Sequence, residues 1–309
     1  MSSPPAAPSG SAAPTSISAP DPTGGDSVRS AAQHSARPES SQGSTQGTLY
    51  LIPVPLGPDQ DPRENLPPAT LAVIATLDCF IVENAKSARA VLRRLPLARP
   101  LQALEISELN EHTPPEQWPA LLAPLKAGRS VGLMSEAGCP AVADPGGGLV
   151  ALAHRQGIRV VPMVGPSSIL LALMASGMSG QSFSFVGYLP VTAPERASRI
   201  QALERRAGAE GQTQIVIETP YRNQALFDAL IEALSPDTLV GVATDLTLVQ
   251  EQVRVATVTQ WRQSPASLPR SPTVFTLARP PELPGGSRPA SRPGPRAPVS
   301  ATSGSRRRR

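Results

Sequence analysis

The stretch Val-Gly-Leu-Met-Ser-Glu-Ala-Gly-Cys-Pro-Ala-Val-Ala-Asp-Pro-Gly, residues 131–146, sets the expected fold. Its first four residues, 131–134, predict a short buried strand, and the Gly- and Pro-containing turn after them leads into a helix expected at 148–156. Another apolar run, 158–161, follows that helix. Apolar strands that alternate with helices are typical of a parallel sheet covered on both faces.

The same alternation extends in both directions along the chain. Towards the N-terminus we expect strands at 49–52 and 79–82, the second followed by a helix at 85–95. Towards the C-terminus we expect a helix at 167–176 with Ser167 as its N-cap, and a helix at 221–234. The strands expected in this half are 183–188, 214–217, 239–244, 253–258 and 273–277. The last three have little helix between them, so this second half is expected to hold a mixed or antiparallel sheet.

The two ends of the chain differ in composition from its middle. Residues 1–46 are 31 Ser, Ala, Pro or Gly residues out of 46, and residues 280–309 are rich in Pro and Arg. Neither segment holds enough apolar surface to offset the entropy lost on ordering, so we expect both to be disordered. The remainder divides into two α/β subdomains, 47–165 and 166–279, with the boundary near Gly165-Pro166.

The net charge of +4 does not describe the folded part. The segment 280–309 carries +6 and the segment 1–46 carries −1, which leaves −1 for residues 47–279. The basic character therefore belongs to the Arg-rich tail, which could supply salt-dependent affinity for RNA or could be a solvated extension without function.

Several classes of protein are excluded or disfavoured. No run approaches the roughly 18 apolar residues of a membrane helix, and the start of the chain lacks the features of a secretory signal. Two cysteines, Cys79 and Cys139, cannot form a disulfide framework, and no metal-binding spacing occurs. We expect a cytoplasmic, metal-independent protein.

Four carboxylates lie at or just past the ends of expected strands: Glu83, Glu136, Glu218 and Asp245. Ligands of open α/β sheets bind beyond the carboxyl ends of the strands, so these acids predict a ligand with hydroxyl, amino or positively charged groups. The alternative is that each acid stabilises a helix N-terminus. A dinucleotide fingerprint, a P-loop and a GxSxG serine elbow are absent, which disfavours those three kinds of site.

Four blocks of sequence occur in one order through the core: LYLIPVPLG (49–57), SEAGCPAVADPG (135–146), VPMVGPSS (161–168) and IETPYR (217–222). Together they resemble the tetrapyrrole methylase superfamily of S-adenosylmethionine-dependent methyltransferases, and within it the ribosomal RNA small subunit methyltransferase I family. The resemblance implies a homodimer of two-subdomain α/β chains with S-adenosylmethionine between the subdomains. It implies that the cofactor is bound by Pro55, Gly57, Ala137, Gly138, Cys139, Val142, Ser167, Ser168, Glu218 and Ala243.

The departures from this family concern the substrate. Where the RNA-methylating branch has an acidic residue followed by Asp-Thr-Arg, this chain has Glu-Asn-Ala-Lys at 83–86. Its His-Asn-Glu piece survives only as Asn110-Glu111. The loss of an arginine removes a bidentate phosphate ligand. The resemblance leaves Lys86, Asn110, Tyr221 and Arg222 as candidate substrate-binding residues.

Methyl transfer to a hydroxyl group benefits from a general base. The candidates are Glu83, Glu136, Asp144, Glu218 and His112, of which we prefer Glu83 and Glu136 because they flank the expected cofactor loops. Asp144 has the alternative role of capping the next helix, and His112 that of an exposed loop residue. Three functions stay open: ribose 2'-O-methylation of rRNA, methylation of a small molecule such as a tetrapyrrole, and cofactor binding without turnover.

Overall fold

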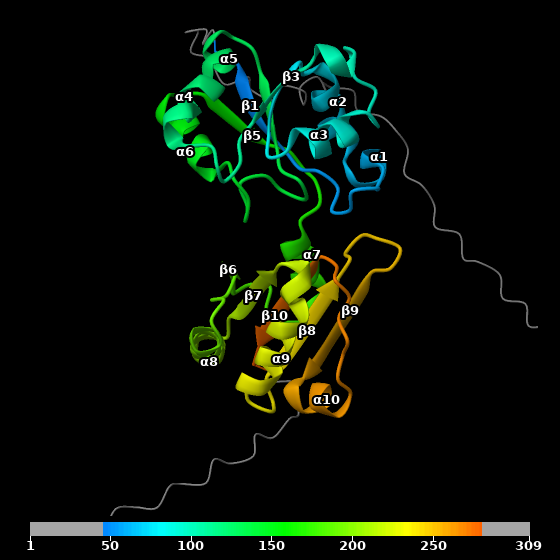
Figure 1. The fold of residues 1–309 in the computed structure, drawn as a ribbon, viewed down its shortest axis with the longest axis vertical. Coiled ribbons are helices and arrows are strands. Elements are labelled where there is room, and N and C mark those ends of the chain that lie inside the picture. The colour runs from blue at the N-terminus through cyan, green and yellow to red at the C-terminus, as the bar shows by residue number, and fades with distance from the viewer. Residues whose placement is uncertain (1–45, 280–309) are drawn as a thin grey trace, which may run out of the picture. The chain divides into compact units, whose positions relative to one another are not determined.

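The computed structural model describes residues 46–279, which form two five-stranded sheets and the helices packed on them (Figure 1). The disorder expected for 1–46 and 280–309 concerns residues outside this range, apart from Gln46. The fold is therefore described for residues 46–279 alone.

The first sheet is entirely parallel, with strand order β3-β2-β4-β1-β5. Its strands are β1 (Thr48–Ile52), β2 (Cys79–Val82), β3 (Glu105–Glu108), β4 (Val131–Met134) and β5 (Arg159–Pro162). Because all five run the same way, the loops that follow them meet at one edge of the sheet. Four of these strands match the predicted apolar runs.

Side chains of the central strands alternate between two apolar clusters, one on each face. Phe80 and Val82 of β2 pack into one cluster, whereas Cys79 and Ile81 pack into the other. Gly132 in β4 leaves the room this packing needs, because a Cβ there would lie 2.6 Å from Ile52 Cδ1. The predicted double-covered parallel sheet is confirmed.

The second sheet is mixed, with strand order β6-β7-β10-β8-β9. Only β6 and β7 pair in parallel, and the pairs β7–β10, β10–β8 and β8–β9 are antiparallel. The strands are β6 (Phe183–Gly187), β7 (Thr213–Glu218), β8 (Leu239–Thr244), β9 (Gln252–Thr257) and β10 (Thr273–Ala278). The mixed character predicted for this half is confirmed.

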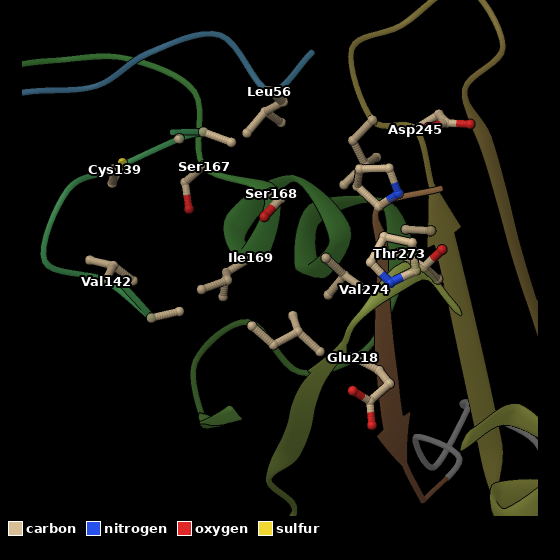
Figure 2. A pocket seen from close by; sticks show the side chains of 18 of the residues that line it. Leu56, Cys139, Val142, Ser167, Ser168, Ile169, Glu218, Asp245, Thr273 and Val274 are labelled. Atoms are coloured by element: carbon tan, nitrogen blue, oxygen red, sulfur yellow. The ribbon is translucent and has the colours of Figure 1, made fainter. Parts of the chain in front are cut away.

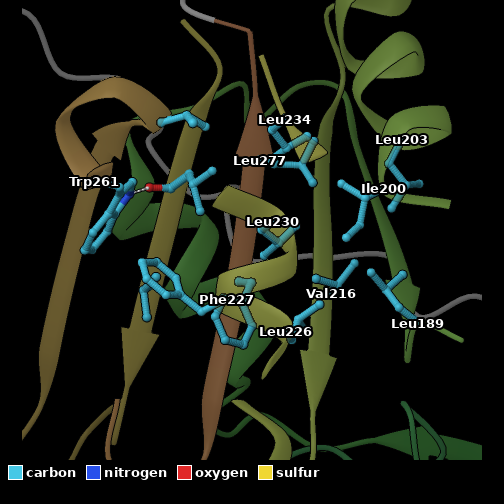
Figure 3. Close-up of a cluster of buried hydrophobic side chains, with 14 of the residues drawn as sticks. Leu189, Ile200, Leu203, Val216, Leu226, Phe227, Leu230, Leu234, Trp261 and Leu277 are labelled. Atoms are coloured by element: carbon cyan, nitrogen blue, oxygen red, sulfur yellow. Dashed lines mark hydrogen bonds between the residues drawn. The ribbon is translucent and has the colours of Figure 1, made fainter. Parts of the chain in front are cut away.

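One face of the second sheet carries the largest apolar cluster (Figure 3). Trp261 is fully buried there, donates from Nε1 to the carbonyl of Val240 at 2.9 Å, and meets Phe227 edge-on with ring centroids 5.0 Å apart. The opposite face packs against Ala172 and Leu173 of the helix that follows the first sheet. This second sheet is thus covered on both faces as well.

The helices include those predicted after β2, β4, β5 and β7, and several that were missed. They are α1 (Pro62–Asn65), α2 (Pro68–Thr76), α3 (Ala85–Leu92), α4 (Trp118–Leu121), α5 (Ala123–Lys126), α6 (Gly147–Arg155), α7 (Ser168–Ser176), α8 (Ala193–Glu210), α9 (Asn223–Ala233) and α10 (Val258–Gln263). The connection from β5 to α7 contains Gly165-Pro166. The proposed subdomain boundary falls in that connection and stays a prediction.

Candidate functional site

A cavity of about 280 Å³ lies where the loops after the first sheet meet the edge of the second sheet (Figure 2). Its lining is largely apolar, with carboxylates and hydroxyls at a few points. The lining residues are Leu56, Ala137, Gly138, Cys139, Val142, Ala143, Asp144, Ser167, Ser168, Ile169, Tyr188, Ile217, Glu218, Thr219, Pro220, Ala243, Asp245, Leu246, Leu248, Pro272, Thr273 and Val274.

The topology explains why these distant segments share one cavity. The segment 137–144 follows β4 of the parallel sheet, so it lies at that sheet's carboxyl edge. In the second sheet β10 runs antiparallel to β7 and β8, which places Thr273 at its start opposite both Glu218 and Thr244. The ends of β4, β7 and β8 and the beginning of β10 therefore meet at the cavity.

Two of the cavity loops hold strained backbone. The non-glycine residues with positive φ in the described range are Ala141, Ala143, Asp245 and Thr247, at φ values of 66°, 66°, 53° and 71°. All four lie in the loops after β4 and β8, and such conformations cost about 1–3 kcal/mol each. Strain of this kind concentrates at ligand sites, which agrees with the position of these two loops in the cavity wall.

Gly138 fixes the loop after β4 to the loop after β1. Its N–H donates to the carbonyl of Val54 at 3.1 Å and its carbonyl accepts from the N–H of Val54 at 2.9 Å. Both backbone polar groups of Gly138 are therefore paired with Val54, and its carbonyl oxygen keeps one further lone pair. Its φ of +70° and its missing Cβ keep space open beside Leu56.

Two serines begin α7 at the wall of the cavity. Ser167 occupies the N-cap position of α7 but its side chain makes no capping hydrogen bond. The hydroxyl groups of Ser167 and Ser168 both line the cavity, as Figure 2 shows beside Ile169. The side-chain cap predicted for Ser167 is absent, and its hydroxyl is available to a ligand.

Asp144 is the carboxylate of the loop after β4 that lines the cavity. Burial raises its pKa to about 7, the negative charges of Glu83 and Glu136 act in the same direction, and the nearby Ser135 hydroxyl opposes them. The helix that follows is capped by Gly146 without a side-chain hydrogen bond, so Asp144 does not cap α6. The alternative role expected for Asp144 is wrong.

Glu83 and Glu136 lie beside each other outside the cavity wall. The carboxylate of Glu83 accepts from the N–H of Glu136 at 3.0 Å, and Glu136 is exposed. Burial raises the pKa of Glu83, and the charge of Glu136 adds to the rise. Neither residue lines the cavity, although both were preferred as general bases.

Glu218 ends β7 with its side chain only 3% exposed. One of its oxygens, Oε1, accepts from Arg222 Nη2 at 2.6 Å, from Arg222 Nε at 3.0 Å and from the N–H of Thr219 at 2.7 Å. Because these donors all converge on Oε1, the other oxygen can serve a ligand. Tyr188 also lines the cavity, and burial together with the charge of Asp144 raises its pKa.

Of the ten residues expected to bind the cofactor, all but Pro55 and Gly57 line the cavity. Those two are buried on either side of Leu56, which does line it. At Gly57 a Cβ would lie 2.4 Å from Leu248, so this glycine permits a close approach of two loops.

The four candidate substrate residues all lie outside the cavity lining. Lys86 is exposed on α3, and the Asn110 side chain accepts from the N–H of His112 in a turn. Tyr221 is 69% exposed, and Arg222 stacks its guanidinium 5.8 Å from that ring while binding Glu218. His112, also considered as a base, has a side chain that is 85% exposed.

Sequence reasoning missed much of the wall formed by the second sheet. Leu246, Leu248 and Pro272 to Val274 were not predicted as site residues, because the first two lie in the loop after β8 and the others reach the cavity through the antiparallel pairing of β10. Tyr188 comes directly after β6 and ends the strand expected at 183–188, and that strand end was the available signal.

Comparison with known proteins decides the family. The model of the tetrapyrrole (corrin/porphyrin) methylases matches residues 48–261. This chain belongs to the tetrapyrrole methylase family. Its members methylate with S-adenosylmethionine, so the protein is an S-adenosylmethionine-dependent methyltransferase.

Named relatives within this family share one description. The chain is 38% identical to a ribosomal RNA small subunit methyltransferase I of Mesorhizobium japonicum, over 68% of this chain and 67% of the relative. It is 30% identical to the protein of that name from Escherichia coli O157:H7, over 70% and 71%.

Two solved structures of this family's fold match the described part. A conserved hypothetical protein from Aeropyrum pernix K1 aligns with a TM-score of 0.53 and 17% identity, over 76% of this chain and 85% of that one. The methyltransferase CobJ aligns with a TM-score of 0.51 and 16% identity, over 76% and 100%. These likenesses show the α/β fold.

The residues around the cavity fit S-adenosylmethionine. The ligand combines an aromatic base, ribose hydroxyls and a positively charged amino acid part, and the cavity pairs an apolar lining with carboxylates and serine hydroxyls. Among residues 46–279 no cluster of three or more His, Cys, Asp or Glu is arranged to hold a metal ion. Within the same residues, no helix is both long enough and apolar enough to cross a membrane.

Proposed function

We propose that the protein methylates a ribose hydroxyl of small-subunit ribosomal RNA. The observation that carries this proposal is the 38% identity, over two thirds of both chains, with a relative described as ribosomal RNA small subunit methyltransferase I. Since ribosomal RNA is a cytoplasmic substrate, the proposal also places the enzyme in the cytoplasm.

Within the cavity, the residues proposed to hold the cofactor are the eight of the predicted set that line it, joined by Leu56 and Asp245. Apolar walls such as Leu56 and Ile169 would take the base, and carboxylates such as Asp245 would accept from hydroxyl or amino groups. When bound, S-adenosylmethionine supplies an electrophilic methyl group. The chain's own contribution is to hold the acceptor oxygen in line with that group and to keep water out.

The surface of α3 supports an RNA substrate. Lys86, Arg89 and Arg93 follow one another at spacings of three and four residues, so they share one face of the helix. All three are exposed, whereas Ala88 and Leu92 of the same helix are buried. Since α3 begins just after Glu83 at the cavity edge of the sheet, we propose that this cationic stripe contacts the RNA backbone.

We propose that two copies of the chain associate through α7. Its exposed side includes Leu170 and Met174, one turn apart and 50% and 78% exposed, and Val164 just before the helix is 70% exposed. Neighbouring exposed apolar side chains of this kind indicate an interaction surface. Light scattering on the full chain tests this, since Met174→Glu should convert a dimer into monomers, and a monomeric wild type would contradict it.

The experiment that tests the proposed function offers several acceptors to the full-length protein with methyl-labelled S-adenosylmethionine. The acceptors are small ribosomal subunits, naked small-subunit rRNA and a tetrapyrrole, and nucleosides from the digested RNA are identified by mass spectrometry. We expect a 2'-O-methylated nucleoside from the RNA arms. Label on a base, or label only in the tetrapyrrole arm, would overturn the proposal.

A further inference from the structure

We propose that Asp144 is the general base that accepts the proton of the acceptor hydroxyl, and that Glu83 and Glu136 tune it without touching the reactants. This inference rests on the proposed function, because it assumes a hydroxyl acceptor. It replaces the expectation from sequence that Glu83 or Glu136 is the base.

Asp144 differs from Glu83 and Glu136 in its position relative to the cavity. Of the three carboxylates that follow β2 and β4, Asp144 is the one that lines the cavity, together with Val142 and Ala143 of its own loop. A group that touches the reacting atoms has to face the cavity, which Glu83 and Glu136 do not.

The backbone of the loop before Asp144 adopts an unusual conformation. Ala141 and Ala143, three residues and one residue before it, both adopt left-handed φ values of 66°, which alanine normally avoids. The loop is also anchored at Gly138 to Val54. Asp144 forms no side-chain cap on α6, so we infer that this costly conformation serves to hold Asp144 at the cavity.

Several titratable and polar side chains lie near Asp144 and act on its charge. Glu83 from the end of β2 and Glu136 from the end of β4 contribute negative charge, and the Ser135 hydroxyl, which donates to the carbonyl of Ala137, lies near the carboxylate. Tyr188 and Cys139 respond to the Asp144 charge in turn, since it raises the pKa of both. Burial and the two acids raise the pKa of Asp144 to about 7, where a general base is most effective at neutral pH.

In the proposed methyl transfer, each bond that breaks is matched by one that forms. The acceptor O–H bond breaks and its proton moves to a carboxylate oxygen of Asp144, while the oxygen forms a bond to the methyl carbon. The methyl–sulfur bond breaks, its electron pair stays on sulfur, and S-adenosylhomocysteine leaves. Asp144 then releases the proton to solvent, which returns the carboxylate for the next turnover.

The test compares wild type, Asp144→Asn, Glu83→Gln and the control Asp228→Asn, an identical chemical change on the exposed surface of α9. We expect the rate of the wild type to rise with pH through a midpoint near 7. Asp144→Asn should lower kcat by roughly 100-fold or more and remove this pH dependence, while calorimetry shows S-adenosylhomocysteine binding within a few-fold of wild type. Glu83→Gln should shift the midpoint to lower pH, and Asp228→Asn should change nothing.

A second readout is independent of turnover. Alkylation of Cys139, followed by mass spectrometry of its peptide, reports the pKa of its thiol, which should fall in Asp144→Asn because a neighbouring negative charge is lost. Wild-type kinetics retained in Asp144→Asn would overturn the inference alone. A wild type inactive on RNA would instead overturn the proposed function, and the Cys139 titration would still show whether Asp144 carries a charge there.

Discussion

Gln60 and Thr247 join two loops that lie 187 residues apart in the chain. The Gln60 side-chain amide donates to the Thr247 carbonyl at 2.7 Å, and the Thr247 hydroxyl donates to Gln60 Oε1 at 3.2 Å. The same Oε1 accepts from the N–H of Gly57 at 3.0 Å. One side chain thus connects the loop after β1 to the strained loop after β8, and both loops contribute residues to the cavity.

We expect Gln60→Ala to loosen this edge of the cavity. Losing the two hydrogen bonds between the loops removes about 1–2 kcal/mol, and we expect S-adenosylhomocysteine to bind about tenfold more weakly. Calorimetry on the full chain measures this, with the exposed Gln201→Ala on α8 as the control. Equal affinity in the two variants would show that the bridge does not shape the site.

Asp144 makes a prediction about stability as well as activity. Its pKa is about 7 in the folded protein and lies near 3.8 in an unfolded chain, so the folded state binds more protons between these values. Stability therefore falls as pH rises through this window. We expect Asp144→Asn to raise the melting temperature at pH 8 and to raise it less at pH 5. A gain that is the same at both pH values, or absent, would contradict the raised pKa.

Arg222 is expected to stabilise the end of β7. It donates twice to the buried Glu218, so Arg222→Ala leaves that carboxylate without its charged partner. We expect a measurable loss in the free energy of unfolding, because the buried carboxylate loses its charged hydrogen-bond donor. Urea unfolding compares it with Arg199→Ala on the exposed side of α8, and equal losses would exclude a role for the pair in stability.

The cationic stripe of α3 predicts salt-dependent RNA binding. Lys86→Glu combined with Arg89→Glu should weaken binding to small-subunit rRNA and lower the slope of log Kd against log salt by about 1.5. The matched control is Arg155→Glu with Arg159→Glu, two exposed arginines at the opposite edge of the parallel sheet. If both double variants bind alike, the RNA does not follow α3. Neither pair should alter S-adenosylhomocysteine binding.

The sequence predicted nine of the ten strands, because most of them are short buried apolar runs and β6 and β9 alternate apolar with other residues. The missed strand, β3, reads Glu-Ile-Ser-Glu and forms the edge of its sheet, where polar side chains meet solvent. The long helix α8 was missed although Ile200, Leu203 and Ala207 are its buried residues at helical spacing. Here the signal was present in the sequence and was overlooked.

The candidate site was predicted best where one loop makes it, as in residues 137–142. Its chemistry was harder to predict. Asp144 and Glu136 look alike in the sequence. They differ in the fold, where Asp144 is buried near the charge of Glu83 and follows left-handed turns at Ala141 and Ala143. Both are properties of the folded loop. In the same way, Thr273 enters the site only because β10 runs antiparallel to its neighbours.

The central claim is that the cavity beside Gly138 binds S-adenosylmethionine. The most direct test is calorimetric titration of the full chain with S-adenosylmethionine and S-adenosylhomocysteine, for wild type, Gly138→Arg and Gly157→Arg. Both glycines have φ of +70°, so both variants carry the same backbone strain, but a side chain at Gly157 meets nothing within 4 Å. We expect wild type and Gly157→Arg to bind both ligands, and Gly138→Arg to bind neither. Undiminished binding by a folded Gly138→Arg variant would contradict it.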